Sequence, residues 1–469
     1  MVNFYDLLGA LGYTKDNLDK RFRIYDNAAK GGTLICNRNW NEDIDIDICG
    51  SRGEGLESSF ASDLDVLFIQ RSVKCFESHL NSPERLKFSL IFSLDLENVP
   101  DGYTKLQFIS MQATNESKNA GFLQNVRDAL EYRNGNYYLS NERTLTTAIE
   151  YRHKNNYESW FKNHIEFDEI AGPSRPFRFK VPVLGRYIDA DFVQAFPCHF
   201  PSLVEAWCTR KRKFDWPSEA LIEEVKGLDV FVVPVGQKGS RDETLQWRVS
   251  MTLAERALVR SFNDSQIKLY KAVKMIVKQE LKPICNDISS YLVKNITFWV
   301  FEETKLSDIT EKNFDCIFIK ILKYFKDCIR RRKVQCYTIP SRNVVENRIT
   351  ETQERELTRH LDIIMSEGVF TLLRCPLILE LAVNPKLSIE SLLIEEVAAE
   401  EIFMSLAALP PIIGNILENL FFNAKSQEEV FILYITIVLP VIQGTNPFGY
   451  FNLIKNMSIE QLFRPFFMD

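Results

Sequence analysis

Asp63 and Asp65 are the residues of this chain whose types and spacing best fit a chemical role. They stand two positions apart, and Asp65 opens the apolar run Val66-Leu67-Phe68-Ile69. Alternate residues of a strand point to the same side, so the two carboxylates would share one face at a sheet edge. Such a pair can hold two Mg²⁺ or Mn²⁺ ions roughly 3.5–4 Å apart for phosphoryl transfer. The spacing therefore predicts a metal-dependent catalytic site.

A glycine-serine turn lies just upstream of this pair, with Gly50-Ser51 followed by Glu54-Gly55. The backbone N–H groups of such a turn, together with the Ser51 hydroxyl, can bind the phosphates of a nucleoside triphosphate. A Ser-Asp-x-Asp tetrapeptide alone would favour a polar loop that enters a strand. The turn before it and the apolar strand after it favour the catalytic interpretation.

A two-metal site needs a third acidic ligand from another strand, and Asp189 and Asp191 are the candidates. Their spacing puts both on one face of a strand, and one of them would be enough to complete the metal clamp. From the residues alone the two are equivalent. The alternative is that both are solvated charges on an edge strand, where they discourage edge-to-edge pairing.

The composition sets the class of protein. The chain has 469 residues, which is long enough for two or three packed units. Its hydrophobic content of 45% is that of a globular protein. The net charge of −6 excludes a bulk polycation, so a nucleic-acid partner would need a local basic patch. Ten scattered cysteines without a CxxC pair indicate reduced thiols. With no secretory signal and no bilayer-spanning run, we expect a cytoplasmic protein without a membrane partner.

The first half of the chain mixes strand and helix patterns, which predicts an α/β or α+β catalytic core. Helical patterns cover 16–30, 118–133 and 141–155. The expected strands, besides the one that starts at Asp65, are 44–49, 88–94, 104–109, 177–183, 187–193, 230–235 and 245–250.

After Ser250 the pattern becomes helical. Thr252 and Glu255 have the spacing of a capping box, and helices are expected over 266–281, 289–303 and 311–331. Past 351 the chain stays helical and becomes strongly apolar, through 372–381, 389–406 and 412–422. We therefore expect a core over 1–252 that includes an N-terminal helix, a helical lobe over 253–350 and a helical C-terminal extension over 351–469.

Several separated blocks resemble the Mab-21 family of nucleotidyltransferases and, within it, the cyclic GMP-AMP synthase-like receptors. The glycine-serine turn is similar to the family's own, Asp63 and Asp65 to its first two metal ligands, and Asp191 with its apolar continuation to its third. The resemblance thus favours Asp191 over Asp189. The other similar blocks are Gly172-Pro173-Ser174, Trp247 to Thr252 with Glu255, Tyr270 to Lys274, Ser289-Ser290-Tyr291 with Lys294, and Tyr337 to Pro340.

The resemblance implies a bilobal α+β nucleotidyltransferase fold, a mixed β-sheet core plus a helical lobe, and it implies that Asp63, Asp65 and Asp191 bind two Mg²⁺ or Mn²⁺ ions. An arginine offers bidentate donors, and stacking of a base on an aromatic ring contributes roughly 1–3 kcal/mol. The residue types also allow another interpretation, in which Tyr291 is an ordinary core tyrosine and Lys271 and Lys274 are solvated helix charges. The implied nucleotide contacts are Ser51 with the triphosphate, Arg248, Ser250 and Thr252 along the base and phosphate side, Lys274 with a phosphate beside Ser290, and Tyr291 stacked on a base.

The implied activity is synthesis of a cyclic dinucleotide second messenger from ATP and/or GTP, in innate immune signalling, with double-stranded RNA as activator. No zinc is expected, because the stretch 255–268 has neither histidine nor cysteine, and Cys198-His199 with Cys208 lacks a fourth ligand. Basic runs that could contact an RNA duplex are Lys20-Arg21 with Arg23, 210–213 and 330–333, unless they are only solvated faces.

Two other functions compete with the cyclase. A Mab-21 protein without turnover could serve as a scaffold, although such members often lose the aspartate set that this chain keeps. A linear nucleotide-adding polymerase would use the same metal chemistry. The blocks at 247–252 and 289–291 favour the cyclase over the polymerase.

Overall fold

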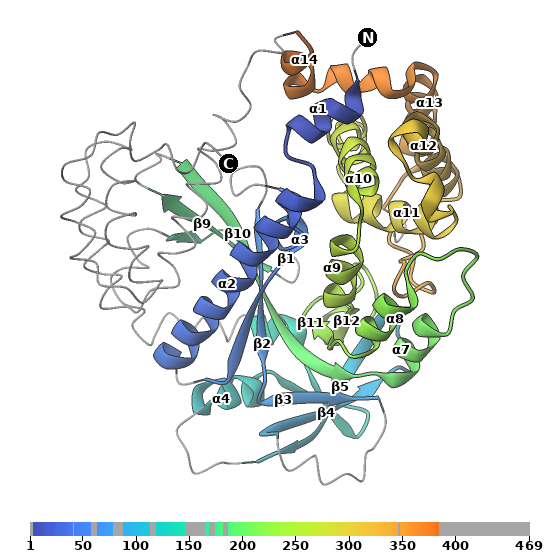
Figure 1. Ribbon diagram of the computed structural model, residues 1–469. Helices are drawn as coiled ribbons and strands as arrows, with labels where there is room; N and C mark the ends of the chain where they lie inside the picture. The colour runs from blue at the N-terminus through green and yellow to red at the C-terminus, as the bar shows by residue number, and fades with distance from the viewer. Residues whose placement is uncertain are drawn as a thin grey trace, which may run out of the picture.

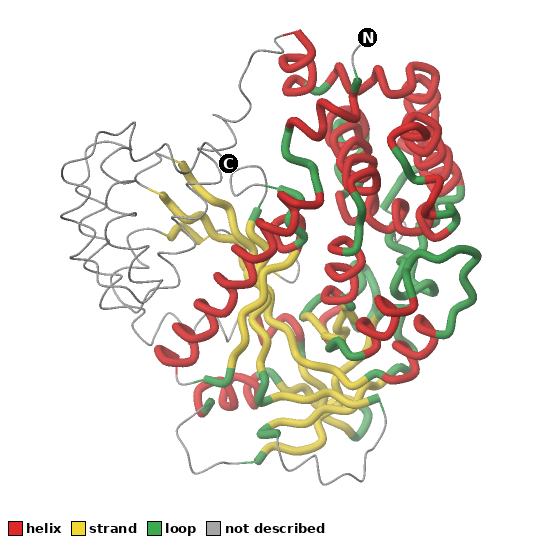
Figure 2. Tube along the Cα trace, viewed as in Figure 1, coloured by secondary structure: helices red, strands yellow, loops and turns green. Residues whose placement is uncertain are grey.

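The computed structural model describes residues 3–40, 42–57, 63–77, 88–112, 119–145, 165–167, 174–181, 186–345 and 348–383. These residues form a mixed β-sheet and a group of helices that stands beside it (Figure 1). Coloured by element type, the strands and the C-terminal helices occupy different parts of the molecule (Figure 2). The expected α+β class, with a mixed sheet and a helical C-terminal region, is confirmed.

The described strands form one 12-stranded sheet, whose main order is β1-β2-β10-β11-β12-β5-β4-β3. Most neighbours are antiparallel, but β10 runs parallel to β2 and to β3, and β3 runs parallel to β4. The parallel β2–β10 pair matters most, because it joins the two segments that carry the candidate metal ligands. The strand bounds are β1 Ile44–Cys49, β2 Leu64–Gln70, β3 Val73–Phe76, β4 Leu90–Asp95, β5 Tyr103–Met111, β6 Leu130–Arg133, β7 Asn136–Leu139, β8 Ile165–Phe167, β9 Ser174–Val181, β10 Arg186–His199, β11 Val230–Val233 and β12 Gln246–Ser250.

Apolar side chains explain why these segments form strands at the centre of the sheet. All four residues of β11 are buried, as expected of a strand that is covered on both faces. Phe196 of β10 stacks on Trp247 of β12, with ring centroids 5.1 Å apart, and on Phe92 of β4. These contacts hold the C-terminal part of β10 against its neighbours.

The helical part is built around α10, which is buried on nearly every side. An Asn263–Gln266 capping box starts this helix, and the π-helical turn η4 (Val277–Leu281) ends it. The N-terminal α1 contacts α10 and α14, whereas α2 runs along β1 (Figure 1). The helix bounds are α1 Phe4–Ala10, α2 Lys15–Trp40, α3 Gly50–Gly53, α4 Ala120–Asp128, α7 Pro201–Cys208, α8 Glu219–Lys226, α9 Thr252–Arg260, α10 Asp264–Ile276, α11 Ser290–Glu302, α12 Phe314–Arg330, α13 Glu351–Glu367 and α14 Pro376–Val383.

Two local expectations were wrong. The helix expected over 118–133 ends at Asp128, and the chain then forms the β6–β7 hairpin around Asn134 and Gly135, both with positive φ. The capping box expected at Thr252 does not form, because Met251 precedes α9 and gives no side-chain cap. The carboxylate of Glu255 instead accepts hydrogen bonds from α11.

The C-terminal extension is described only as far as residue 383. There α13 packs on α12, and the 3-10 helix η7 (Gly368–Arg374) leads to α14, so this part is helical as expected. The expected helices at 389–406 and 412–422 lie outside the described residues, as does most of the expected 141–155 helix. Among the described helices, none combines the length and the apolar character that a membrane span requires.

Candidate active site

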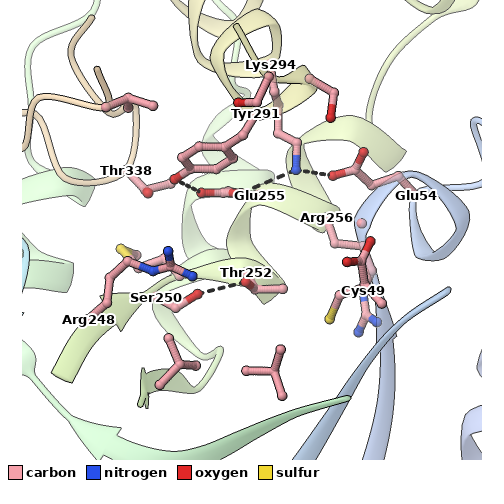
Figure 3. A pocket seen from close by; sticks show the side chains of 18 of the residues that line it. Cys49, Glu54, Arg248, Ser250, Thr252, Glu255, Arg256, Tyr291, Lys294 and Thr338 are labelled. Carbon is pink, nitrogen blue, oxygen red and sulfur yellow. Dashed lines mark hydrogen bonds and ion pairs between the residues drawn. The ribbon is translucent and has the colours of Figure 1, made fainter. Parts of the chain in front are cut away.

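A cavity of about 400 Å³ opens where the sheet meets the helical lobe. Its wall combines the β1–α3 turn, β2, β12, α9, the start of α11 and the segment around Ile339 (Figure 3). This volume lies within the usual range for small-molecule sites. The lining includes seven of the residues singled out from the sequence, namely Ser51, Asp65, Arg248, Ser250, Thr252, Ser290 and Tyr291.

Of the three candidate metal ligands, Asp65 lines this cavity, and Asp63 and Asp191 lie next to Asp65 but outside the cavity lining. Asp65 and Asp191 are directly opposed Cα partners in the parallel β2–β10 pair, and Asp63 comes two residues before Asp65. Burial raises the pKa of Asp65 to about 6, and repulsion by Asp191 and Asp63 adds to the rise. Burial also raises the pKa of Asp191, with Asp63 contributing. The three carboxylates therefore interact, although position 191 is remote from the other two in the sequence.

Asp189 has a different environment from Asp191. Its carboxylate accepts a hydrogen bond from Nε of Arg178 at 2.9 Å, and both side chains are about half exposed. Asp191 accepts one from the Ser174 hydroxyl at 3.0 Å, on the partner strand β9. The geometry thus gives Asp189 a surface ion pair and leaves Asp191 beside Asp65.

This donor set fits a hard divalent cation. Carboxylate oxygens are the ligands that Mg²⁺ and Mn²⁺ prefer, and a cation would offset both the burial and the repulsion that raise the pKa of Asp65. Within the described part of the chain, no three acidic, histidine or cysteine side chains are close enough together to hold a metal ion, so the three aspartates do not form a complete ligand set in this arrangement. Ions bound here would need phosphate oxygens and water as further ligands, which Mg²⁺ commonly takes.

The glycine-serine turn is a short helix, α3, that lies against Asp65. Gly50 has a φ of +63°, and a Cβ at this position would lie 1.8 Å from Oδ2 of Asp65. Glycine is thus required at position 50 both for its backbone conformation and for the space that the carboxylate occupies. The same turn places Ser51 in the cavity wall.

Replacing Gly50 with alanine should damage both the fold and the site. The positive φ costs alanine about 1–2 kcal/mol, and the new Cβ must displace the Asp65 carboxylate. Gly135→Ala is a matched control, because Gly135 has a φ of +87° but no atom within 4 Å of its Cβ position. We expect urea unfolding to show a clearly larger loss for Gly50→Ala. Equal losses would mean that Asp65 does not depend on this contact.

Ser51 is held by Lys274 of α10, which shares the acceptor Glu57 with Lys271. Nζ of Lys274 donates to the Ser51 hydroxyl at 2.6 Å and to Glu57 at 2.9 Å, and Nζ of Lys271 donates to Glu57 at 2.6 Å. Both lysine side chains are largely buried, so the alternative that they are solvated helix charges is wrong. Lys274 lies behind Ser51 rather than in the cavity wall itself.

Tyr291 closes the cavity from the helical side, and its hydroxyl is fixed by a buried charge network. That hydroxyl donates to Glu255 at 2.9 Å, and Lys294 pairs with Glu255 at 3.4 Å and with Glu54 of the α3 turn (Figure 3). Burial opposes the charge on Lys294, but Glu54 and Glu255 outweigh it and raise the pKa of Lys294 well above its ordinary value. The network joins α3, α9 and α11 at the cavity floor.

The opposite wall carries the residues expected on the base and phosphate side. The hydroxyls of Ser250 and Thr252 are 2.8 Å apart, and Arg248 lies beside them on β12 (Figure 3). Arg342 and Arg348 line the same cavity and were not singled out from the sequence. Nothing in their local pattern marked them, because they follow the last helix of the resembling region in an irregular segment.

The raised pKa of Asp65 predicts how the metal-free protein responds to pH. Folding raises this pKa from 3.8 to about 6, so the folded state binds the proton more tightly than the unfolded state. The resulting stabilisation is complete below about pH 4 and is lost as the pH rises through about 6. With a chelator present, wild type should lose unfolding free energy relative to Asp65→Asn over this interval. Parallel pH curves for the two proteins in urea unfolding would contradict the raised pKa.

The basic runs are only partly available as a nucleic-acid surface. Arg210 and Arg212 pair with the buried Glu302 at 2.6 and 3.2 Å, and Arg210 also lies over the Trp299 ring. Arg21 is buried and donates to the carbonyl of Gly55. These three arginines are structural, so the solvated-face alternative does not describe them either. The exposed members of the runs are Lys20, Arg23, Lys211, Lys213, Arg330, Arg331 and Lys333.

Comparison with known proteins supports the assignment of the helical lobe. Residues 265–362 match the family profile described as the Mab-21 protein HhH/H2TH-like domain. The match starts at the beginning of α10 and ends inside α13, so it includes the helices that carry Lys274 and Tyr291. No curated protein matches the chain.

Proposed function

We propose that this Mab-21 family protein is a metal-dependent nucleotidyltransferase that joins two nucleoside triphosphates into a cyclic dinucleotide. The observation that carries the proposal is the pairing of Asp65 with Asp191 across β2 and β10, because Asp65 lines a cavity whose wall also includes Ser51. Family membership rests on the helical lobe. The activity rests on the carboxylates and on the cavity that adjoins them.

Each residue has a defined task in this proposal. Ser51 binds the triphosphate, Lys274 contacts a phosphate with Ser290 beside it, and Arg248, Ser250 and Thr252 line the base and phosphate side. Tyr291 stacks on a base, and its fixed hydroxyl keeps the ring in one orientation. Asp63, Asp65 and Asp191 would hold two Mg²⁺ or Mn²⁺ ions, which activate the attacking hydroxyl and neutralise the leaving group.

The reaction needs no covalent participation of the protein. A ribose hydroxyl of one nucleotide attacks the α-phosphorus of the other, a new P–O bond forms in line, and the bond to the β-phosphate breaks as pyrophosphate leaves. A second transfer of the same kind closes the ring and releases a second pyrophosphate. Positioning and charge stabilisation supply the catalysis.

ATP and GTP as substrates, double-stranded RNA as activator and a role in innate immune signalling are further parts of the proposal. They follow from the resemblance of the catalytic blocks. An activator would act by shifting the population toward the state in which the carboxylates and Ser51 can bind a metal-bound triphosphate.

The test is a product assay. The purified protein is incubated with the four labelled nucleoside triphosphates and Mg²⁺ or Mn²⁺, with and without double-stranded RNA or DNA, and products are separated after phosphatase treatment. A phosphatase-resistant dinucleotide supports the proposal. An extended ladder would instead identify a linear polymerase, and absence of product under every condition would identify a scaffold without turnover.

A further inference from the structure

Glu57 is a buried carboxylate with two lysines on the same oxygen. It lies four residues after the end of α3, its side chain is 9% exposed, and its Oε1 accepts from Lys271 at 2.6 Å and from Lys274 at 2.9 Å. The two lysines are three residues apart on α10, so they lie on one face of that helix. The Glu57 carboxylate, from the sheet side, thus accepts hydrogen bonds from two ammonium groups of the helical lobe.

The same geometry fixes the position of Lys274 relative to Ser51. Lysine has a flexible four-carbon stem, so an ammonium held in one place has already lost its rotamer freedom. The Lys274 Nζ has three N–H donors. Among the described residues, it donates to Ser51 and to Glu57. A phosphate oxygen that approaches Ser51 therefore meets an ammonium that is already in place.

Burial explains why a second lysine is needed. Burial opposes ionisation of Glu57, but attraction by Lys271 and Lys274 outweighs it and lowers the pKa of Glu57 to about 2. If Lys274 were the sole partner, a phosphate that shared its ammonium would leave the buried carboxylate poorly compensated, at a large cost. Lys271 keeps Glu57 paired while Lys274, still held by Glu57, also contacts a ligand.

We propose that Glu57 is a positioning residue for polyphosphate binding: it holds the Lys274 ammonium against the Ser51 hydroxyl, and Lys271 is its permanent counter-charge. This inference rests on the proposed function, because it assigns a task to the triphosphate side of the same site. It adds a residue outside the glycine-serine turn and outside the cavity wall. It also explains why two lysines converge on one acid.

The test measures binding of inorganic tripolyphosphate to the whole chain by calorimetry, with a chelator present so that the metal site plays no part. The key variant is the double substitution Glu57→Gln with Lys271→Met, which removes one charge of each sign and keeps the local net charge. We expect it to bind about tenfold more weakly than wild type, because a preorganised charged hydrogen bond is lost. Lys274→Met should abolish binding.

A matched control comes from Glu280, which also has two nitrogen partners but lies away from the cavity. It accepts from Arg374 at 2.7 Å and from His360 at 2.9 Å. The double variant Glu280→Gln with Arg374→Met should bind tripolyphosphate as wild type does. Urea unfolding of both double variants checks that they are folded.

The outcomes separate this inference from the proposed function. Wild-type affinity in the Glu57/Lys271 variant would show that Glu57 is only a structural counter-ion, and a wild type that does not bind tripolyphosphate would also overturn the inference, even if dinucleotide is formed. Weakened binding in that variant, without product from wild type in the separate turnover assay, would uphold the inference and refute the enzyme. In an active protein the same variant should raise KM while kcat stays within about twofold.

Discussion

Substituting Asp191 with asparagine should abolish dinucleotide synthesis while the protein stays folded. The substitution keeps the shape of the side chain and an oxygen that can accept from Ser174, but it removes one charge from the three carboxylates. Metal ions supply several kcal/mol of transition-state stabilisation, and each 1.4 kcal/mol corresponds to about tenfold in rate, so we expect at least about a thousandfold loss. Because burial disfavours the ionised form of Asp191, the amide should not destabilise the fold.

Asp189→Asn is the matched control for this experiment. Asp189 lies two positions earlier on the same face of β10, and its partner is Arg178 at the surface. The exposed ion pair contributes at most about 1 kcal/mol, so turnover and stability should stay close to wild type. If Asp189→Asn lost activity and Asp191→Asn kept it, the third ligand would be misassigned.

Replacing Lys294 with methionine should cause the largest loss of stability among single substitutions at the site. Lys294 is the cation between Glu54 and Glu255, and all three side chains are almost completely buried. Removing it leaves two buried carboxylates without their counter-charge, which costs about 3–5 kcal/mol. Urea unfolding at neutral pH measures this loss. Turnover should fall as well, since Tyr291 and the α3 turn lose their common anchor.

Lys326→Met provides the comparison for a surface pair. Lys326 binds Asp362 between α12 and α13, and the Asp362 side chain is 55% exposed. This pair should be worth at most about 1 kcal/mol. The account would be wrong if the two methionine variants lost similar unfolding free energy, because the buried network at Lys294 would then contribute no more to stability than an exposed ion pair.

The sequence predicted those parts of the fold that depend on local patterns. Alternating or continuous apolar residues marked β1, β2 and β10. The Asp63–Asp65 spacing predicted two carboxylates on one strand face, but β2 begins only at Leu64, so Asp63 lies just before the strand. The resemblance, rather than the spacing, chose Asp191 over Asp189. The structure gives the physical difference between them, since only Asp191 lies opposite Asp65.

The failures have equally definite causes. The expected helix over 118–133 ignored Asn134-Gly135, which is a strong hairpin signal because both residues adopt positive φ. The expected capping box at Thr252 failed because Glu255 is used by Tyr291 and Lys294, which come from a distant helix. Long-range pairing of charges, as in Glu57 with Lys271 and Lys274, leaves no local pattern to detect.

The most direct test of the central claim is a crystal structure with Mn²⁺ and a non-reactive nucleoside triphosphate analogue, in which anomalous scattering locates the metal. We predict two manganese peaks about 3.5–4 Å apart, both bound by carboxylate oxygens of Asp65 and its neighbours Asp63 and Asp191, with the triphosphate against Ser51. Manganese bound elsewhere, or a nucleotide seated in the cavity without metal at these carboxylates, would contradict the account.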